Sequence, residues 1–309
     1  MPGKWRPSPW PAARIAGSRP VRILMTQSVA ITRFNGHEAL ALRTSDGSSA
    51  TVLLHGAHAL SWVPAGQGEQ FYLSPSSSYA AGAPIRGGVP VIFPQFSGQG
   101  PLQRHGFARN MVWELVQTEA GADGAQAVLR LRDDAHSYAM WPHRFELEMR
   151  VRISARSLEL GLSCLNPGQA AFSFACALHT YLRLDNLADA AVHGLGGLRY
   201  HDAVAGADKT QQESVLSPAG DLDRIYYGVH QPLRLSEQRG AHLRQIQIDQ
   251  QGFADAVVWN PGAAKCSALT DMPPEGYRRM LCIEAACIEK PVLLSPGGRW
   301  SGAQTLTLL

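Results

Sequence analysis

Apolar and charged side chains alternate without interruption between residues 145 and 153, in the stretch FELEMRVRI. A period of two is typical of a strand that buries one face and exposes the other to water. The alternation resumes over residues 158–164, after a turn near residue 155. Residues 144–165 are therefore predicted to form an antiparallel hairpin.

Shorter runs of this kind follow one another from about residue 37, and no stretch keeps helical spacing for three turns. Strands are expected at Ala39–Leu42, Thr51–Leu54, Val112–Val116, Ala127–Leu131, Ile246–Ile248, Ala256–Trp259, Met280–Ala285 and Thr305–Leu309. Strands at roughly ten-residue spacing, without alternating helices, predict an all-β protein built as a large antiparallel β-sandwich. The sequence has no internal repeat or linker, so we expect one domain over residues 26–309.

The composition supports a folded, turn-rich protein. Of 309 residues, 45% are hydrophobic and only 17% are charged, with 30 Gly and 20 Pro, which excludes a disordered chain and a coiled coil. The five cysteines include no C-x-x-C pair and lie mostly in apolar runs, which predicts reduced core thiols in a cytoplasmic protein. No apolar stretch approaches the ~20 residues that span a membrane.

The net charge of +3 comes from the N-terminus. Residues 1–25 carry five basic residues and no acid, which leaves −2 for the remainder, so we do not expect nucleic-acid binding. We interpret residues 1–25 as a disordered, basic, proline-rich extension. Two alternatives stay open: translation starting at Met25, or an organellar transit peptide, since the segment is rich in arginine and free of acids.

Polar side chains that could bind a ligand are most concentrated in residues 83–96 and 104–110. Two glycines and three prolines give this segment an irregular backbone. Its polar candidates are Arg86, Gln95, Arg104, His105 and Arg109. Arginine offers a planar fork of donors matched to phosphate or carboxylate, so we expect an anion site here rather than a solvated loop with unrelated charges. No G-K-[ST] follows the paired glycines, which argues against a nucleotide-binding P-loop.

Two ionisable residues lie within apolar strand patterns, His179 and Glu284. A lone histidine there is more often a hydrogen-bonded core residue, whereas an unpaired glutamate is almost never fully buried. Together they are equipment for general acid–base catalysis.

Other kinds of site fit the sequence less well. The histidine pairs 55/58 and 193/201 lack the partners and spacing of a zinc site, and no G-x-S-x-G elbow is present. We expect neither a metal nor a cofactor.

A series of short segments is similar to the signature of a known family. The segments are Leu54–Ala57 with Ser61-Trp62, Ile85–Pro90 with Phe93–Phe96, His105–Asn110 with Trp113, Ala177–Tyr181, Gly194-Leu195, the region of Tyr200 and Asp202, Asp223–Tyr226, Trp259–Pro261 and Cys282–Glu284. In this order they resemble the glucose-6-phosphate 1-epimerases, the hexose-6-phosphate mutarotases of the aldose 1-epimerase superfamily. The resemblance covers about residues 37–309.

The resemblance implies a galactose mutarotase-like supersandwich and a set of site residues. His179 matches the family's catalytic histidine and Glu284 its catalytic glutamate, while Asp223 matches an acidic residue that contacts the sugar. Arg86 and Arg109 match substrate-binding arginines, with His105 beside them, and we also expect Gln95 to bind substrate. Some members have glutamine where this chain has Arg104, so Arg104 either adds a phosphate contact or points to solvent.

The implied activity is cofactor-free interconversion of the α and β anomers of a hexose 6-phosphate, with glucose 6-phosphate foremost. Glu284, as carboxylate, would take the C1 hydroxyl proton while His179, as imidazolium, protonates the ring oxygen. We expect a monomer whose partner is this substrate. The alternatives are a mutarotase of unphosphorylated aldoses and a non-catalytic β-sandwich that binds sugar phosphates.

Overall fold

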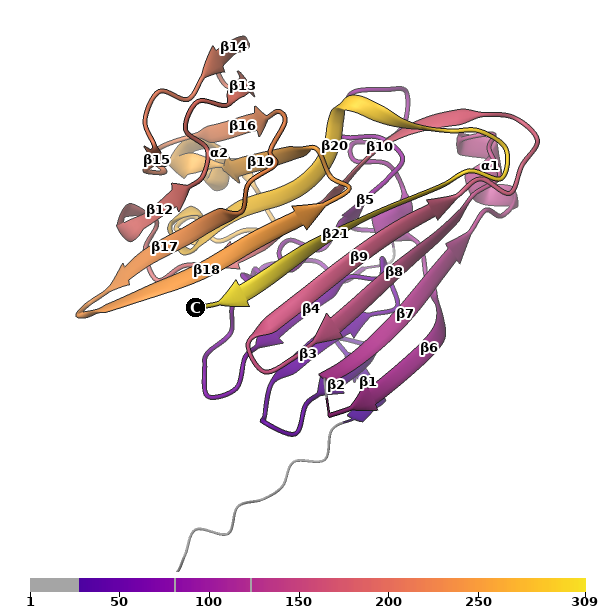
Figure 1. The fold of residues 1–309 in the computed structure, drawn as a ribbon, viewed down its shortest axis with the longest axis horizontal. Coiled ribbons are helices and arrows are strands. Elements are labelled where there is room, and N and C mark those ends of the chain that lie inside the picture. Colours follow the sequence, from indigo (N-terminus) through magenta and orange to yellow (C-terminus); the bar gives the residue numbers. More distant parts are fainter. Residues whose placement is uncertain (1–27, 81, 123) are drawn as a thin grey trace, which may run out of the picture.

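The computed structural model describes residues 28–80, 82–122 and 124–309, so the predictions for residues 1–25 lie outside the described chain. Within these ranges the strands form three sheets of nine, eight and four strands, and every pairing between named strands is antiparallel (Figure 1).

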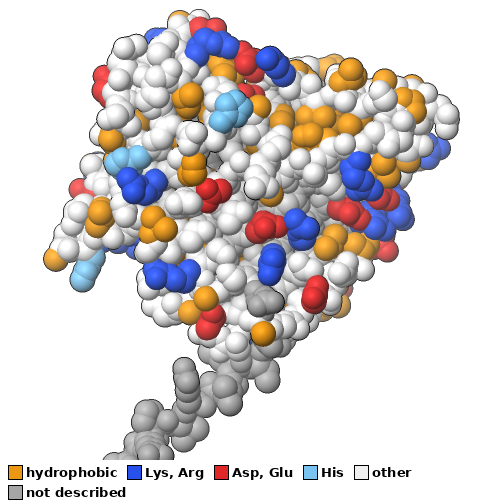
Figure 2. Space-filling view, viewed as in Figure 1, with side chains coloured by type: hydrophobic (Ala, Val, Ile, Leu, Met, Phe, Trp, Pro, Cys, Tyr) orange, Lys and Arg blue, Asp and Glu red, His pale blue; other side chains and the backbone are white. Residues whose placement is uncertain are grey.

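The nine-stranded sheet lies across the front of Figure 1, in the order β15-β12-β17-β18-β21-β9-β8-β7-β6. Its strands are β6 (Glu114–Gly121), β7 (Gly124–Arg132), β8 (Glu146–Ile153), β9 (Ser157–Leu165), β12 (Ala190–His193), β15 (Val215–Leu216), β17 (Leu233–Arg239), β18 (His242–Gln251) and β21 (Arg299–Leu308). Figure 2 shows acidic and basic side chains interspersed over this face, where ion pairs such as Arg130–Glu148 and Arg150–Glu159 join neighbouring strands.

The eight-stranded sheet has the order β14-β13-β16-β19-β20-β10-β5, and β11 also pairs with β20. Its strands are β5 (Val91-Ile92), β10 (Phe172–Leu178), β11 (Tyr181–Arg183), β13 (Arg199–Asp202), β14 (Ala207–Thr210), β16 (Leu222–Tyr226), β19 (Asp255–Asn260) and β20 (Met280–Leu294). The long strand β20 leads directly into β21 of the other sheet (Figure 1).

The four-stranded sheet comprises β1 (Ser28–Phe34), β2 (His37–Arg43), β3 (Ser49–Leu53) and β4 (Ala59–Val63). It lies behind β6–β9 in Figure 1. An isolated bridge joins Ala59 of β4 to Val89, and a second joins Phe71, which follows β4 in the chain, to Leu182 of the eight-stranded sheet. The molecule is therefore a sandwich whose second layer consists of two sheets.

Helices are few and short. They are α1 (Ala135–Met140), α2 (Gly262–Ala268) and the 3₁₀ turns η1 (Ala108–Asn110), η2 (Leu187–Asp189) and η3 (Gly276–Arg279). Among the described residues, none of these helices has the length and apolar character needed to cross a membrane.

The structure confirms the predicted all-β fold and the hairpin, which consists of β8 and β9. The strand expected at Val112–Val116 instead starts at Glu114, because Val112 is 69% exposed and pairs only with His55 in an isolated bridge. The strand Ser28–Phe34 was not predicted, since most of its side chains are exposed and it shows little apolar alternation. All five cysteines are free and buried, as expected.

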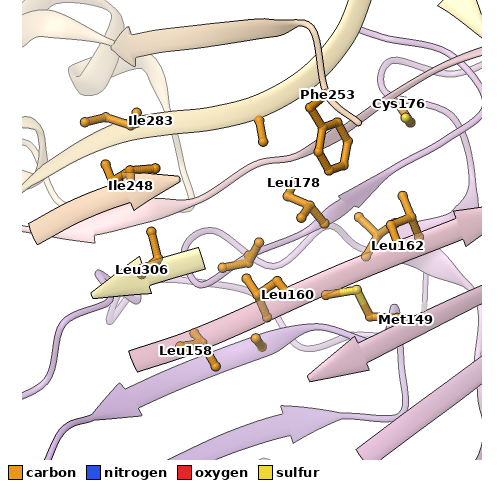
Figure 3. Packing of buried hydrophobic residues seen from close by; sticks show 14 of the residues in the cluster. Met149, Leu158, Leu160, Leu162, Cys176, Leu178, Ile248, Phe253, Ile283 and Leu306 are labelled. Atoms are coloured by element: carbon orange, nitrogen blue, oxygen red, sulfur yellow. The ribbon is translucent and has the colours of Figure 1, made fainter. Parts of the chain in front are cut away.

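The main core lies between the sheets. Figure 3 shows Leu178 and Ile283 of the eight-stranded sheet opposite side chains of the nine-stranded sheet that include Leu160, Ile248 and Leu306. Along β20, residues 281, 283, 285 and 287 belong to this core, whereas residues 280, 282 and 286 belong to small clusters on the other face. Because strand side chains alternate, Glu284 also faces away from the main core.

Candidate active site

A cavity of about 510 Å³ lies on this second face of the eight-stranded sheet. Asp223, Val257 and Glu284 line it from β16, β19 and β20, while their chain neighbours pack into the main core. Its further lining residues include Arg86, Ser97, Arg104, His105, Arg109, His179, Tyr181, Trp259, Lys265 and Asp271. The cavity thus gathers residues from distant parts of the sequence.

His179 and Glu284 form a buried pair at this cavity. The distance from His179 Nδ1 to Glu284 Oε1 is 3.4 Å, and the two residues are 7% and 1% exposed. His179 Nδ1 and Glu284 Oε2 have no hydrogen-bond partner among the described residues. Since an unsatisfied buried polar atom is costly, these atoms are available to polar groups of a ligand in the cavity.

Burial sets the resting charge of this pair. It lowers the pKa of His179 well below 6.5, assisted by His105 and the positive charges of Arg86 and Arg109. Burial also raises the pKa of Glu284 well above 4.5, and the Asp223 carboxylate adds to this shift. Neutral imidazole and protonated carboxyl are thus favoured in the free protein, one proton transfer away from the charged forms expected at the outset.

Aromatic neighbours fix the plane of His179. The ring of Tyr181 stacks on it with centroids 4.8 Å apart and an interplanar angle of 9°. His105 meets it edge-on at 5.6 Å. The amide N–H of Ser97 donates to His105 Nδ1, which leaves Nε2–H as a donor while the ring is neutral. Burial, with Arg109, Arg104 and Arg86, lowers the pKa of His105 to about 3, so the ring stays neutral.

The loop around residues 84–90 is bonded to the segment that carries His179. The backbone N–H of His179 donates to the Pro90 carbonyl, and that of Tyr181 donates to Gly88. Gly87 has φ +116°, and a Cβ there would overlap the carbonyl oxygen of Tyr72. Glycine at this position lets the loop approach closely, which places the neighbouring Arg86 at the cavity.

Arg86 is held by two residues of the cavity. Its Nε lies 3.2–3.3 Å from the two Asp271 carboxylate oxygens, its Nη2 lies 3.1 Å from Oδ2, and its Nη1 donates to the Tyr181 hydroxyl at 3.0 Å. This fork geometry orients the guanidinium and offsets its charge. It also connects Arg86, through Tyr181, to the ring of His179.

Arg104 and Arg109 carry positive charge that no carboxylate of the described residues pairs with. Arg109 Nη2 donates to the Arg104 carbonyl at 2.8 Å, while its buried Nε has no partner in the described chain. Burial, with the charges of Arg86 and Arg104, lowers the pKa of Arg109. An anion entering the cavity would relieve this uncompensated positive charge.

Besides Glu284, seven residues were predicted for the site, and six of them line the cavity: His179, Arg86, Arg104, His105, Arg109 and Asp223. Gln95 is the exception. Its amide nitrogen donates to the carbonyls of Ser97 and Leu102, and its amide oxygen accepts from the Leu102 N–H. Gln95 therefore does not line the cavity, because its polar atoms brace the loop backbone.

Sequence reasoning missed Tyr181, Trp259, Lys265 and Asp271 as lining residues. Tyr181 and Trp259 had a usable signal, since each lies in a strand segment beside the predicted catalytic residues. Lys265 pairs with Asp221 at 2.8 Å from helix α2, and Asp271 follows in a loop. Only the tertiary fold brings those two to the cavity.

The arrangement combines an acid–base pair with a cationic region. Two groups that exchange one proton can act on two oxygens of a substrate at once. Unpaired arginines beside them suit a negatively charged substituent. Proton transfer on a polar, anionic small molecule is the chemistry this cavity can perform.

Comparison with known proteins supports the same kind of chemistry. The family model described as Aldose 1-epimerase matches residues 38–307. A relative from Escherichia coli K12, named "Putative glucose-6-phosphate 1-epimerase", is 35% identical over 240 residues, which cover 77% of this chain and 79% of the relative. A relative of the same name from Cenchrus ciliaris is 30% identical, covering 88% of this chain and 85% of the relative.

Solved structures share the fold. A crystal structure titled as a putative mutarotase from Salmonella typhimurium has a TM-score of 0.83 and 27% identity, covering 91% of this chain and 93% of that one. Galactose 1-epimerase from Lactobacillus acidophilus has a TM-score of 0.66 at 14% identity, covering 92% of this chain and 99% of that one, and supports the fold alone. The match over residues 38–307, together with these relatives, shows that the chain belongs to the aldose 1-epimerase family, whose members are isomerases.

Proposed function

We propose that this enzyme interconverts the α and β anomers of hexose 6-phosphates, with glucose 6-phosphate as the first candidate. The observation that carries the proposal is the buried His179–Glu284 pair in one cavity with two arginines that lack carboxylate partners in the described chain. The names of the relatives from Escherichia coli and Cenchrus ciliaris support the same substrate.

The proposed reaction needs one base and one acid. Glu284 takes the proton of the C1 hydroxyl, the bond from C1 to the ring oxygen breaks, and the ring oxygen takes a proton from His179. The open aldehyde rotates about C1–C2 and recloses on its other face as both protons return. Both residues end as they began.

The resting and reacting forms of the pair carry the same number of protons. The free protein favours protonated Glu284 and neutral His179, whereas the reaction starts from carboxylate and imidazolium. A single proton shift across the 3.4 Å gap, directly or through a bound hydroxyl, connects the two forms. A positioned acid and base are each worth ~10²–10⁴-fold, which suffices for a reaction that sugars already undergo in water.

Arg86 and Arg109, with Arg104 at the rim, are proposed to bind the 6-phosphate, which carries nearly two negative charges at neutral pH. The oriented fork of Arg86 supplies directional hydrogen bonds. Arg109 supplies charge that the described protein leaves uncompensated. Binding the remote phosphate then holds the reacting carbon against the catalytic pair, with Asp223 as a contact to the sugar.

The test of catalysis is anomer exchange on glucose 6-phosphate, measured by saturation-transfer NMR with purified protein. The wild type should exchange the anomers well above the spontaneous rate. Glu284→Gln should lose at least about 100-fold while its thermal midpoint changes little, because the amide keeps the shape but cannot accept the proton. Near-wild-type exchange in Glu284→Gln would reject the assignment, and a wild type that only binds the sugar would establish the non-catalytic alternative.

Substrate class is tested by comparing glucose with glucose 6-phosphate. Arg109→Ala should raise the KM for glucose 6-phosphate by about tenfold or more and leave exchange of free glucose nearly unchanged, because only the phosphate needs the charge. Arg109→Lys is the matched control and should retain part of the affinity. Equal effects of Arg109→Ala on both sugars would favour a mutarotase of unphosphorylated aldoses.

A further inference from the structure

Three ligand-type side chains converge at the catalytic pair. His179, Cys282 and Glu284 each offer one metal-binding atom, and these atoms all lie within 4.8 Å of one another. All three residues are buried. Cys282 and Glu284 are two positions apart on β20, so their side chains leave the same face of the strand.

We propose that these three residues form an inhibitory zinc site, in which Zn²⁺ occupies the catalytic pair and stops proton transfer. Nitrogen, sulfur and oxygen ligands of these types are those that zinc prefers in proteins. Three protein ligands leave a fourth tetrahedral position, which here would face the cavity. The site is distinct from the histidine pairs considered from the sequence, none of which includes a cysteine and a carboxylate.

The unsatisfied polar atoms of this group also point to a ligand at this place. His179 Nδ1 and Glu284 Oε2 are buried and lack a hydrogen-bond partner within residues 28–80, 82–122 and 124–309. His179 and Glu284 line the cavity, so an ion can reach them from solvent, while Cys282 lies behind them in a cluster with Tyr181 and Met280. Shifts of less than about 1 Å would bring atoms at these separations to zinc–ligand distances of 2.0–2.3 Å.

Charges on both sides act on an ion that enters the proposed site. Arg86, Arg104, Arg109 and Lys265 of the same cavity repel a dication, whereas Asp223 and Asp271 attract it. Binding as a thiolate and a carboxylate releases protons as Zn²⁺ enters, and the two negative ligands then balance the charge of the ion.

The experiment titrates ZnCl₂ into chelator-treated full-length protein during anomer exchange on glucose 6-phosphate. Wild-type exchange should be lost, EDTA should restore it, and more substrate should raise the zinc concentration required. Cys282→Ala should keep most of its exchange without zinc but need at least about tenfold more zinc for half inhibition. Cys266→Ala is the matched control, since Cys266 belongs to the same buried cluster but not to the ligand group.

A second readout does not depend on the proposed reaction. Co²⁺ added to the wild type and to Cys266→Ala should give a thiolate-to-metal charge-transfer band, which Cys282→Ala should lack. Cys282→Ser replaces the alanine variant if the latter does not fold. Equal zinc sensitivity of the Cys282 variant and the wild type, or a wild type without the cobalt band, would overturn the proposal even if exchange itself is confirmed.

Discussion

Glu284 is a carboxyl group in a place where carboxyl groups are rarely stable. It is 1% exposed, and one of its oxygens has no partner in the described part of the chain. Burying such a group costs stability, and burial raises the pKa of Glu284 because the protonated carboxyl carries less of this cost than the carboxylate does. The nearby neutral His179 is then the complementary proton acceptor.

The dependence of kcat on pH follows from the two pKa directions. The pair lacks a base when both groups are protonated and lacks an acid when both have lost their protons. The state in which both groups are protonated forms only near the lowered pKa of His179. We therefore expect the acid limb of kcat to lie below pH 6.5. The state in which both groups have lost their protons forms near the raised pKa of Glu284. The alkaline limb of kcat should therefore lie well above pH 4.5.

NMR exchange rates at saturating glucose 6-phosphate between pH 4 and 9 would measure these limbs, after subtraction of the spontaneous rate. Saturation removes the contribution of phosphate titration to binding of the free substrate. Arg104→Gln, at the exposed rim, is the control and should leave the acid limb in place. An acid limb at or above pH 6.5 would contradict the neutral resting state of His179.

At the residue scale, the sequence indicated most of the predicted residues that gather at the cavity, but not the contacts between them. His179 and Glu284 were identifiable because each interrupts an apolar strand, which is costly unless the residue has a use. Gln95, predicted to bind substrate, instead bonds the backbone of its own loop and does not line the cavity, and nothing in the sequence separates these two uses of a loop glutamine. Asp271 gave no signal, since its role exists only where it meets Arg86.

The loop and strand that carry Arg86 and His179 act as one element. Backbone hydrogen bonds join Gly88 to Tyr181 and Pro90 to His179, so a displacement of the loop moves the ring of His179. Strand positions were predictable wherever one face is buried, as in β8 and β9. The strand Ser28–Phe34 was not predictable, because its sequence shows little apolar alternation and it is defined only by its pairing with β2 in the folded protein.

Gly87→Ala tests this close approach. The added Cβ would overlap the Tyr72 carbonyl oxygen and the backbone has φ +116°, so we expect more than about 1 kcal/mol of destabilisation and a lower exchange rate. Urea unfolding and NMR exchange would measure the two effects. Gly68→Ala is the control, because a Cβ there meets nothing within 4 Å and its φ is unstrained. Equal behaviour of the two variants would contradict the proposed packing.

At the scale of the whole molecule, the two faces of the eight-stranded sheet have different roles. The face toward the nine-stranded sheet is apolar and supplies the core, while the opposite face carries the cavity of the candidate active site. The net positive charge of the chain is irrelevant to this division, because the positive charge that matters is local to the cavity. A disordered basic extension over residues 1–25, a single domain over 26–309, cytoplasmic location and a monomeric state remain predictions.

Leu160→Ala separates stability from catalysis at this scale. Leu160 is fully buried in β9, in the sheet that does not carry the cavity. Its truncation should cost about 2–5 kcal/mol in urea unfolding while the exchange rate per folded molecule stays near wild type. Leu243→Ala on β18 is the control, since that side chain is 57% exposed. A large loss of exchange in folded Leu160→Ala would show that the two faces are coupled.

Along strand β20, the side chains that face the core alternate with those that face the opposite side of the sheet. Odd positions from 281 to 287 face the core, and even positions from 280 to 286 face the cavity or the small clusters around it. Substitutions at the even positions therefore change the surroundings of Glu284 and the small clusters beside the cavity, whereas substitutions at the odd positions change the packing of the main core. A single-residue insertion or deletion here would exchange the two sets, so this stretch should tolerate substitution far better than a change of length.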